Sequence, residues 1–213
     1  MANLTDDLIV VSATAQNQSS SSAWRDAICP NCGRAQCLVV AAAKARKADN
    51  LPPEDAILWL RCISCRMGIV INGDVQSPGA DAVGGVRGLP SDVADAWNEV
   101  RVSLAGGANT GAVMMCRKIL FHVAVEHGMN EKTDKGRAPT FAQVLDHLRD
   151  VGLVTPPMMP WVERIRDVGN EANHELPATS LAEATRVATF THQLLVLVFQ
   201  MAAEMVEALG SHD

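Results

Sequence analysis

The sequence lacks tyrosine and is poor in other aromatic residues. Its 213 residues include four Trp, four Phe and no Tyr, so aromatics make up 4%. We therefore do not expect a carbohydrate-binding face or an aromatic stacking platform for single-stranded nucleic acid. An excess of positive charge is missing as well, because 18 Lys and Arg oppose 24 Asp and Glu, a formal net charge of −6. This is the wrong sign for a general nucleic-acid-binding protein.

Long hydrophobic runs are also missing. The most apolar stretch, Leu194 to Ala203, is interrupted by Gln200 and ends at Glu204, well short of the roughly 20 residues that a membrane-spanning helix needs. The N-terminus has no basic segment, and its apolar run Leu8 to Val11 is too short for a secretory leader. We therefore expect a cytoplasmic protein without a membrane segment, in which cysteines stay reduced.

Signatures of several enzyme classes are absent too. The sequence contains no phosphate-cradling Gly-rich loop, no Gly-x-Ser-x-Gly elbow and no His-Glu-x-x-His motif.

Cysteine, histidine and charged residues are unevenly distributed along the chain. Five of six cysteines precede residue 70, whereas all six histidines follow it. Residues 1–70 carry seven Lys and Arg against six Asp and Glu, and the remainder carries eleven against eighteen. This asymmetry predicts two modules of different chemistry.

The cysteines of the first module form two Cys-x-x-Cys pairs. Cys29 and Cys32 make one pair, Cys62 and Cys65 make the other, and 29 residues separate the pairs. Structural zinc takes four soft ligands in a tetrahedron, and two pairs that each lead into a β-rich stretch are typical of a zinc ribbon. We predict structural Zn²⁺ on these four cysteines. Cys37 would replace one of them if the strand register differs.

The pattern around and after the pairs divides the chain into four parts. Residues 1–23, which end in four serines, are predicted to be a flexible tail. Residues 24–72 form the zinc ribbon, residues 73–90 a Gly-rich linker, and residues 91–213 a helical bundle. The predicted fold class is therefore α+β. The basic residues around the cysteine pairs either contact phosphates or form a solvated rim that offsets the negative charge of the zinc site. They are Arg25, Arg34, Lys44, Arg46, Lys47, Arg61 and Arg66.

Five helices are expected in the second module. The first runs to about Leu104, and the second runs to His127 and buries Cys116 in its apolar stripe. Residues that can cap helices are Ser91 or Asp92, Thr110, Thr140 with Gln143, and Ser180 with Glu183. The last helix, 181–209, is apolar on more than one face, which indicates a central helix or one that packs against a second subunit.

A polar cluster lies on the fourth helix. At 100° per residue, Arg166, Asn170, Asn173 and His174 fall on one stripe. Metal-independent RNA cleavage needs such groups: His exchanges protons near neutral pH and Arg stabilises a phosphorane-like transition state. The alternative is structural, with Gly169 permitting close helix packing and the polar groups satisfying the backbone. On the second helix, His122 and Glu126 either join the cleft at that cluster, with Arg117 one and a half turns earlier, or form a surface or interhelix polar pair, and we favour the pair.

The order of these motifs resembles a known family. A Cys-Pro-x-Cys-Gly knuckle, a second knuckle, Leu89-Pro90 before a helix, the segment 116–120 (Cys-Arg-Lys-Ile-Leu) and the closing Arg166-x-x-Gly169-Asn170-x-x-x-His174 are similar to the domain-of-unknown-function family 4145. The resemblance covers residues 27–208. It implies a helical part of the HEPN superfamily, whose members occur in prokaryotic conflict systems and include RNases assembled across a dimer.

The resemblance leaves three functions open. The first is a metal-independent endoribonuclease in which His174 is the acid and base, Arg166 stabilises phosphate and Asn170 positions the substrate. The second is a non-catalytic, homodimeric interaction module for a protein or RNA partner in phage defence or restriction. The third is a nucleotide or small-molecule sensor that uses the same cleft. The spacing from Arg166 to His174 is longer than is usual for the RNases, and the bundle is acidic, which favours the second.

Overall fold

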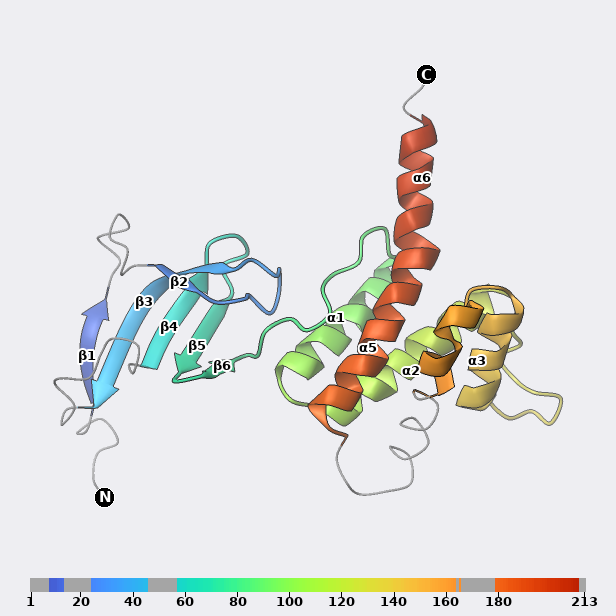
Figure 1. Ribbon diagram of the computed structural model, residues 1–213, viewed down its shortest axis with the longest axis horizontal. Helices are drawn as coiled ribbons and strands as arrows, with labels where there is room; N and C mark the ends of the chain where they lie inside the picture. Colours follow the sequence, from blue (N-terminus) through green and yellow to red (C-terminus); the bar gives the residue numbers. More distant parts are fainter. Residues whose placement is uncertain (1–7, 14–23, 46–56, 164, 166–178, 211–213) are drawn as a thin grey trace. The chain divides into compact units, whose positions relative to one another are not determined.

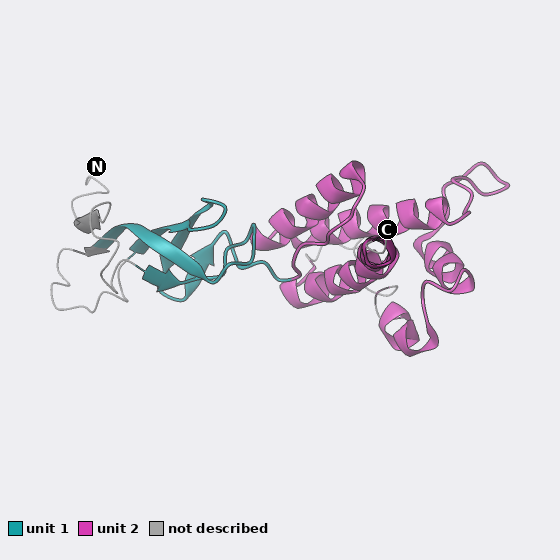
Figure 2. Cartoon of the chain, turned by 90° about the horizontal axis from the view of Figure 1, so that it is seen from above, with its two compact units in different colours: residues 1–82 teal, residues 83–213 magenta. Residues whose placement is uncertain are grey.

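The chain folds as two compact units, residues 1–82 and 83–213 (Figure 2). The computed structural model describes residues 8–13, 24–45, 57–163, 165 and 179–210. An antiparallel sheet in the first unit is followed by helices in the second, so the predicted α+β class is confirmed. The boundary between the units falls within the Gly-rich segment 73–90.

The first unit is one antiparallel sheet with the strand order β1-β3-β4-β5-β6, in which β2 also pairs with β3 (Figure 1). Its strands are β1 (Leu8–Ala13), β2 (Trp24–Asp26), β3 (Gln36–Ala45), β4 (Ile57–Cys62), β5 (Gly68–Asn72) and β6 (Val75–Ser77). The sequence predicts β-rich stretches at 36–42, 57–61 and 67–71, and these correspond to β3, β4 and β5. The first Cys-x-x-Cys pair lies between β2 and β3 and the second lies between β4 and β5, and the pairing of Cys37 with Cys62 brings both to the same end of the sheet.

Alternation along the strands gives this sheet a buried and an exposed face. In β4, Leu58, Leu60 and Cys62 are buried, whereas Trp59 and Arg61 are exposed. This is the period of two expected of a half-buried strand. The small core on the buried face consists of Ala27, Cys29, Cys37, Val39, Leu58, Leu60, Cys62 and Ile69. So few residues make a modest hydrophobic contribution, and small folds of this kind generally need a metal or disulfides.

Two segments are more ordered than the sequence predicts. Leu8–Ala13 lies within the predicted tail but forms β1, which pairs antiparallel with the second half of β3. These six residues form an edge strand of the sheet. Val75–Ser77, within the predicted linker, forms β6 against β5. Hydrogen bonds from the side-chain amide of Gln76 to the carbonyls of Ile28 and Pro78 hold this strand.

The second unit is helical. Its elements are α1 (Ser91–Ala105), α2 (Asn109–Glu126), α3 (Phe141–Asp150), a 3₁₀ turn η3 (Pro156–Met158), α5 (Leu181–Leu195), a π-helical stretch η4 (Val196–Gln200) and α6 (Met201–Gly210). Its large core includes Trp97, Leu120, Leu148, Phe190 and Leu194. Cys116 is fully buried there, as the sequence predicts.

The helix ends test the capping predictions. Both predicted capping boxes form: Thr140 exchanges hydrogen bonds with Gln143, and Ser180 does so with Glu183. The other cap predictions are wrong. Pro90 occupies the N-cap of α1, so neither Ser91 nor Asp92 caps it, and α2 begins one residue before Thr110. The Thr110 hydroxyl instead donates a hydrogen bond to Thr179, ahead of α5.

The last helix changes character along its length. In α5, Phe190 and Leu194 are buried, and in η4 Val198 and Phe199 still pack partly against the core. Other apolar side chains face solvent, and their exposure rises from 38% at Leu197 in η4 to 76% at Leu209 in α6. Figure 1 shows α6 extending beyond the helices that pack against α5. Among the described residues, Leu181–Gly210 is the one helix whose length and composition would suffice to cross a membrane, a weak indication because core helices of soluble proteins share it.

Candidate metal centre

Each Cys-x-x-Cys pair lies in a tight turn at the same end of the sheet. In the first turn the Cys29 N–H donates to the Arg34 carbonyl at 2.9 Å, and the Gly33 N–H donates back to the Cys29 carbonyl at 3.0 Å. In the second, the Cys62 N–H donates to the Met67 carbonyl at 2.9 Å, and the Arg66 N–H donates to Cys62 at 3.1 Å. The two turns repeat the same backbone pattern.

Both turns need a left-handed residue after the second cysteine. Gly33 has φ +69° and Arg66 has φ +68°. Glycine adopts this conformation without strain, whereas Arg66 is the one non-glycine with positive φ among the described residues. Arg66 therefore carries a side chain at a position where glycine would be less strained.

The two turns bring the four predicted cysteines together. All four sulfur atoms lie within 4.8 Å of one another, with 3.4 Å between Cys29 and Cys65 and 3.5 Å between Cys32 and Cys62. Four sulfurs 2.3 Å from a central Zn²⁺ would be separated by about 3.8 Å. All four are free thiols rather than disulfides. The cluster is therefore compatible with a tetrahedral metal site with soft sulfur ligands.

The pKa values of the cysteines differ between the two turns. Burial raises the pKa of Cys29 to about 12. The Asn31 side chain and the Met67 backbone instead lower the pKa of Cys65 to about 6. Burial opposes ionisation of Cys62, but backbone hydrogen bonds from Cys65 and Ser64 lower its pKa. The second turn thus favours thiolates, and a metal ion would displace the proton of Cys29 on binding.

Cys37 lies beside the cluster but outside it. It pairs with Cys62 across β3 and β4, is buried, and its thiol donates to the Ala27 carbonyl at 3.6 Å. Burial, and then the neighbouring cysteines, raise the pKa of Cys37 to about 11. The register therefore places Cys37 in the core as a neutral thiol rather than in the set of four.

The predicted catalytic residues Arg166, Asn170 and His174 lie outside the described residues. Of the other candidates, His122 Nε2 lies 3.4 Å from Glu126 Oε1 and 3.7 Å from Asp92 Oδ2. The partly exposed pair with Glu126 is the one that the sequence predicts, and Asp92 of α1 adds a contact between helices that it did not predict. His122, Asp92, Lys118 and apolar neighbours line a cavity of about 280 Å³. 

Arg117 of α2 contacts α3. Its guanidinium stacks 4.6 Å from the centre of the Phe141 ring, and burial lowers its pKa. This half-buried guanidinium on an aromatic ring joins α2 to α3.

Comparison with known proteins gives one match, to the helical unit. Residues 98–210 fit the model of a domain of unknown function, DUF4145. The chain belongs to the DUF4145 family. No curated protein and no solved structure matches it. The resemblance predicted from the sequence spans residues 27–208, whereas the DUF4145 match begins at residue 98, so the four cysteines precede the matched segment.

The structure also adds a residue that sequence reasoning missed. Trp24 lies on the exposed face of the sheet and, with Arg61 and Arg66, lines a cavity that borders Cys62. The two arginines belong to the predicted basic rim, but nothing in the sequence near Trp24 links it to them. The one local signal for this cavity is the alternation in the segment 57–61, which would have placed Trp59 and Arg61 on one face of the sheet.

Proposed function

We propose that this DUF4145 protein is a non-catalytic interaction protein, with a first unit organised by structural Zn²⁺ and a second unit that forms a homodimer. The observation that carries the proposal is the apolar stripe on the last helix, defined by Leu197, Met201, Met205 and Leu209. Soluble monomers rarely leave such a contiguous apolar surface in water, and larger patches generally mark interfaces.

Zinc is supported by the chemistry of the four cysteines. Cys29, Cys32, Cys62 and Cys65 offer soft sulfur ligands at separations close to a tetrahedron, a set that suits Zn²⁺ and iron. Four protein ligands fill a tetrahedral zinc ion and leave no position for substrate, so the role is structural. Reduced cysteines also fit the expected cytoplasmic location.

Metal content decides between zinc and iron. We expect one zinc per chain by elemental analysis of the purified protein. Substitution with Co²⁺ should give the intense visible bands of a tetrahedral thiolate site. Cys32→Ser, at an exposed position, should abolish those bands. An iron content of one per chain, with iron–thiolate absorption, would contradict zinc.

The dimer is supported by the geometry of the stripe. Its four side chains recur every four residues, so they lie along one side of the helix, and their exposure exceeds a third throughout. Val206 adds to the same surface at 71% exposure. A second copy presents an identical apolar stripe, so a two-fold axis would bury both at once.

Oligomeric state tests this interface. We expect the wild type to sediment as a dimer and the double variant M205E/L209E to sediment as a folded monomer. V102E is the matched control, because Val102 is an exposed apolar residue of α1 outside the stripe. A wild-type monomer at high concentration, or a monomer produced equally by V102E, would contradict the dimer. Association with lipid vesicles that depends on Met205 and Leu209 would assign the stripe to a membrane instead.

The catalytic alternative rests on residues within the matched family segment. Residues 98–210 include Arg166, Asn170 and His174. The resemblance to the HEPN superfamily implies that such residues cleave RNA, in proteins of prokaryotic defence and restriction systems. Incubation of mixed RNA with the chain in EDTA tests it. Cleavage by wild type that both H174A and R166A lose, while still folded, would replace our proposal with an endoribonuclease. A nucleotide sensor would instead bind ligand at these residues without cleaving RNA.

A further inference from the structure

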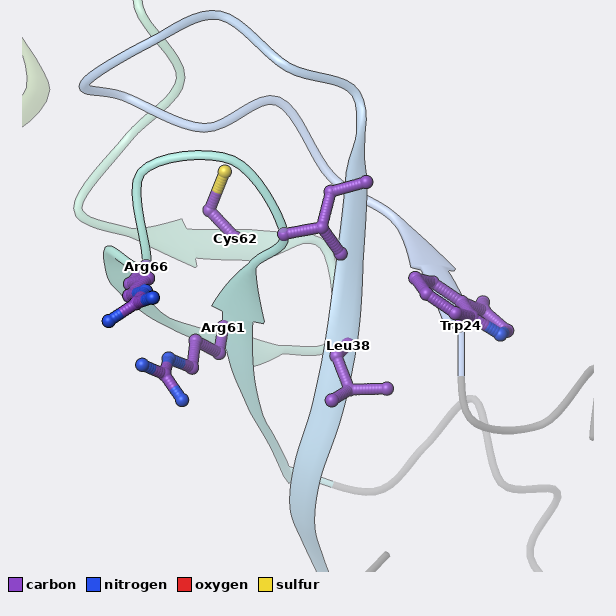
Figure 3. Close-up of a pocket in the computed structure, with 6 residues that line it drawn as sticks. Trp24, Leu38, Arg61, Cys62 and Arg66 are labelled. Carbon is purple, nitrogen blue, oxygen red and sulfur yellow. The ribbon is translucent and has the colours of Figure 1, made fainter. Parts of the chain in front are cut away.

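A cavity of about 450 Å³ opens on the exposed face of the sheet beside the cysteine cluster. Its lining combines the indole of Trp24, two aliphatic side chains and two guanidinium groups; the residues are Trp24, Leu38, Arg61, Cys62, Ile63 and Arg66. Figure 3 draws Arg61 and Arg66 on one side of the cavity and Trp24 on the other, with Leu38 between them. The cavity therefore has a cationic side and an aromatic side.

Strand register fixes the spacing between these sides. Trp24 of β2 pairs with Leu38 of β3, and Leu38 pairs with Arg61 of β4. The three residues thus form one row across adjacent strands, on one face. Neighbouring strands lie about 4.8 Å apart, so the Trp24 and Arg61 backbones are separated by about 10 Å. A nucleotide spans a distance of this order between the plane of its base and its phosphate.

The cysteine turns hold the two arginines in place. Arg61 directly precedes Cys62, and Arg66 directly follows Cys65. The positive φ of Arg66 and its backbone hydrogen bond to Cys62 fix where its side chain leaves the turn. Within the described part of the chain neither guanidinium forms an ion pair with a carboxylate, and no acidic side chain lines the cavity.

We propose that this cavity binds single-stranded nucleic acid, with a base stacked on Trp24 and the adjoining phosphates on Arg61 and Arg66. The proposal rests on the interaction role proposed above and supplies the partner of its first unit. Aromatic stacking combined with a cationic track is how proteins bind single strands without reading sequence. A base can reach Trp24 only when it is unstacked, which excludes duplexes. An acidic peptide would use the arginines but has no planar group for the indole.

Charge provides the competing explanation. Four thiolates around a divalent ion carry a net charge of −2, and the two arginines would offset it without binding a ligand. The two roles differ in what the arginines control. A rim that only neutralises the cluster affects metal affinity, whereas a binding site affects the affinity for an oligonucleotide at equal metal content.

Fluorescence anisotropy of short labelled oligouridine and oligothymidine, titrated with the full-length zinc-loaded chain, tests the proposal. We expect Trp24→Leu to weaken binding about fivefold or more, and Trp24→Phe to retain most of it, because stacking on an aromatic ring contributes about 1–3 kcal/mol per base. Arg61→Gln and Arg66→Gln should each weaken binding and reduce the slope of log K against log salt by about 0.7.

Two matched variants control for fold and charge. Trp59 is as exposed as Trp24, at 41% against 39%, but does not line the cavity, so Trp59→Leu should bind normally. Arg34 lies in the first cysteine turn outside the cavity, so Arg34→Gln should also bind normally. Metal content and circular dichroism are measured for every variant, and affinities are compared at matched zinc occupancy.

Several results would overturn the proposal. These are equal binding by Trp24→Leu and wild type, stronger binding to polyglutamate than to the oligonucleotides, and arginine variants that lose zinc affinity but bind normally once loaded. Absence of binding by a wild-type chain that sediments as a dimer would remove this site and leave the proposed dimer intact. Binding by a monomer would do the reverse, so the two proposals fail separately.

Discussion

The sulfur of Cys29 lies 3.4 Å from that of Cys65, 36 residues further along the chain. Cys32 and Cys62 approach in the same way, at 3.5 Å. The first cysteine of one turn therefore meets the last of the other, and the inner two meet each other. These contacts join the two cysteine turns directly. Without them, the turns are connected only through the strands that flank them. A metal ion at the centre of the four sulfur atoms would tie β2 and β3 to β4 and β5.

Metal removal should unfold the first unit and leave the second helical. The sheet has a small core, and a structural zinc site contributes on the order of 10 kcal/mol to folding at neutral pH. Hydrogen exchange after chelation should show full exchange of β3 to β5 and retained protection of α2 and α5. Complete loss of the helical circular dichroism signal on chelation would contradict independent units.

Cys37 should be dispensable for metal binding. It is a neutral core thiol bonded to the Ala27 carbonyl, so Cys37→Ala should keep one metal per chain and lose only packing, about 1 kcal/mol of unfolding free energy. Cys32→Ala, at an exposed position that contributes little packing, should reduce metal affinity severely. Competition with a chromogenic chelator measures both. Equal losses of affinity in the two variants would place Cys37 among the ligands.

The buried thiol of Cys116 should make the helical unit sensitive to alkali. Burial raises the pKa of Cys116 to about 12 from an ordinary value of 9.0, although a hydrogen bond with Thr191 opposes the shift. Because the folded-state pKa is raised, the stabilisation is complete below the unfolded pKa and is lost as pH rises from about 9 towards 12.

Comparison with Cys116→Ala isolates this effect. The difference in unfolding free energy between wild type and variant should shrink above about pH 9 by up to about 1.4 kcal/mol per pH unit. Urea unfolding followed by helical circular dichroism at several pH values measures it. A difference that stays constant from about pH 8 to about pH 10 would show that Cys116 does not titrate in this way.

Gly88 should resist substitution more than other left-handed glycines. It has φ +71°, and an added Cβ would lie 3.1 Å from the Cβ of Ala203 in α6. Its neighbour Arg87 donates through its backbone N–H to the Gln200 side chain at 3.1 Å and forms an ion pair with Glu204. Gly88→Ala should therefore cost roughly 1–3 kcal/mol and loosen α6 from this segment.

Gly107→Ala serves as the control, because Gly107 has φ +76° and open space around its Cβ position. It should show the backbone strain alone, about 1 kcal/mol. Adding Ala203→Gly to Gly88→Ala should restore the part of the unfolding free energy that is lost through the contact with the Ala203 side chain. Equal destabilisation by the two single alanine variants, measured by urea unfolding, would mean that the Ala203 contact contributes nothing.

Local signals in the sequence were sufficient for several features. The capping boxes of Thr140 with Gln143 and of Ser180 with Glu183 each need only two residues three positions apart. Their hydrogen bonds therefore depend on the start of the helix and not on distant segments. The Cys-x-x-Cys spacing likewise brings two sulfurs together within one turn, so the four clustered cysteines could be predicted as two pairs. Cap positions governed by a long-range contact were mispredicted, as at Thr110, whose hydroxyl bonds to Thr179 instead.

Tertiary structure decided what lies beside those local features. The exclusion of Cys37 from the cluster and the row of Trp24, Leu38 and Arg61 both depend on strand register, which is set by pairing between distant segments. Whole-chain composition disfavoured aromatic stacking because it averages over both units, whereas one exposed indole beside two guanidinium groups is a local property of one face. The apolar end of the last helix was visible in sequence, but the exposure of Met201, Met205 and Leu209 follows from where the other helices stop packing against it.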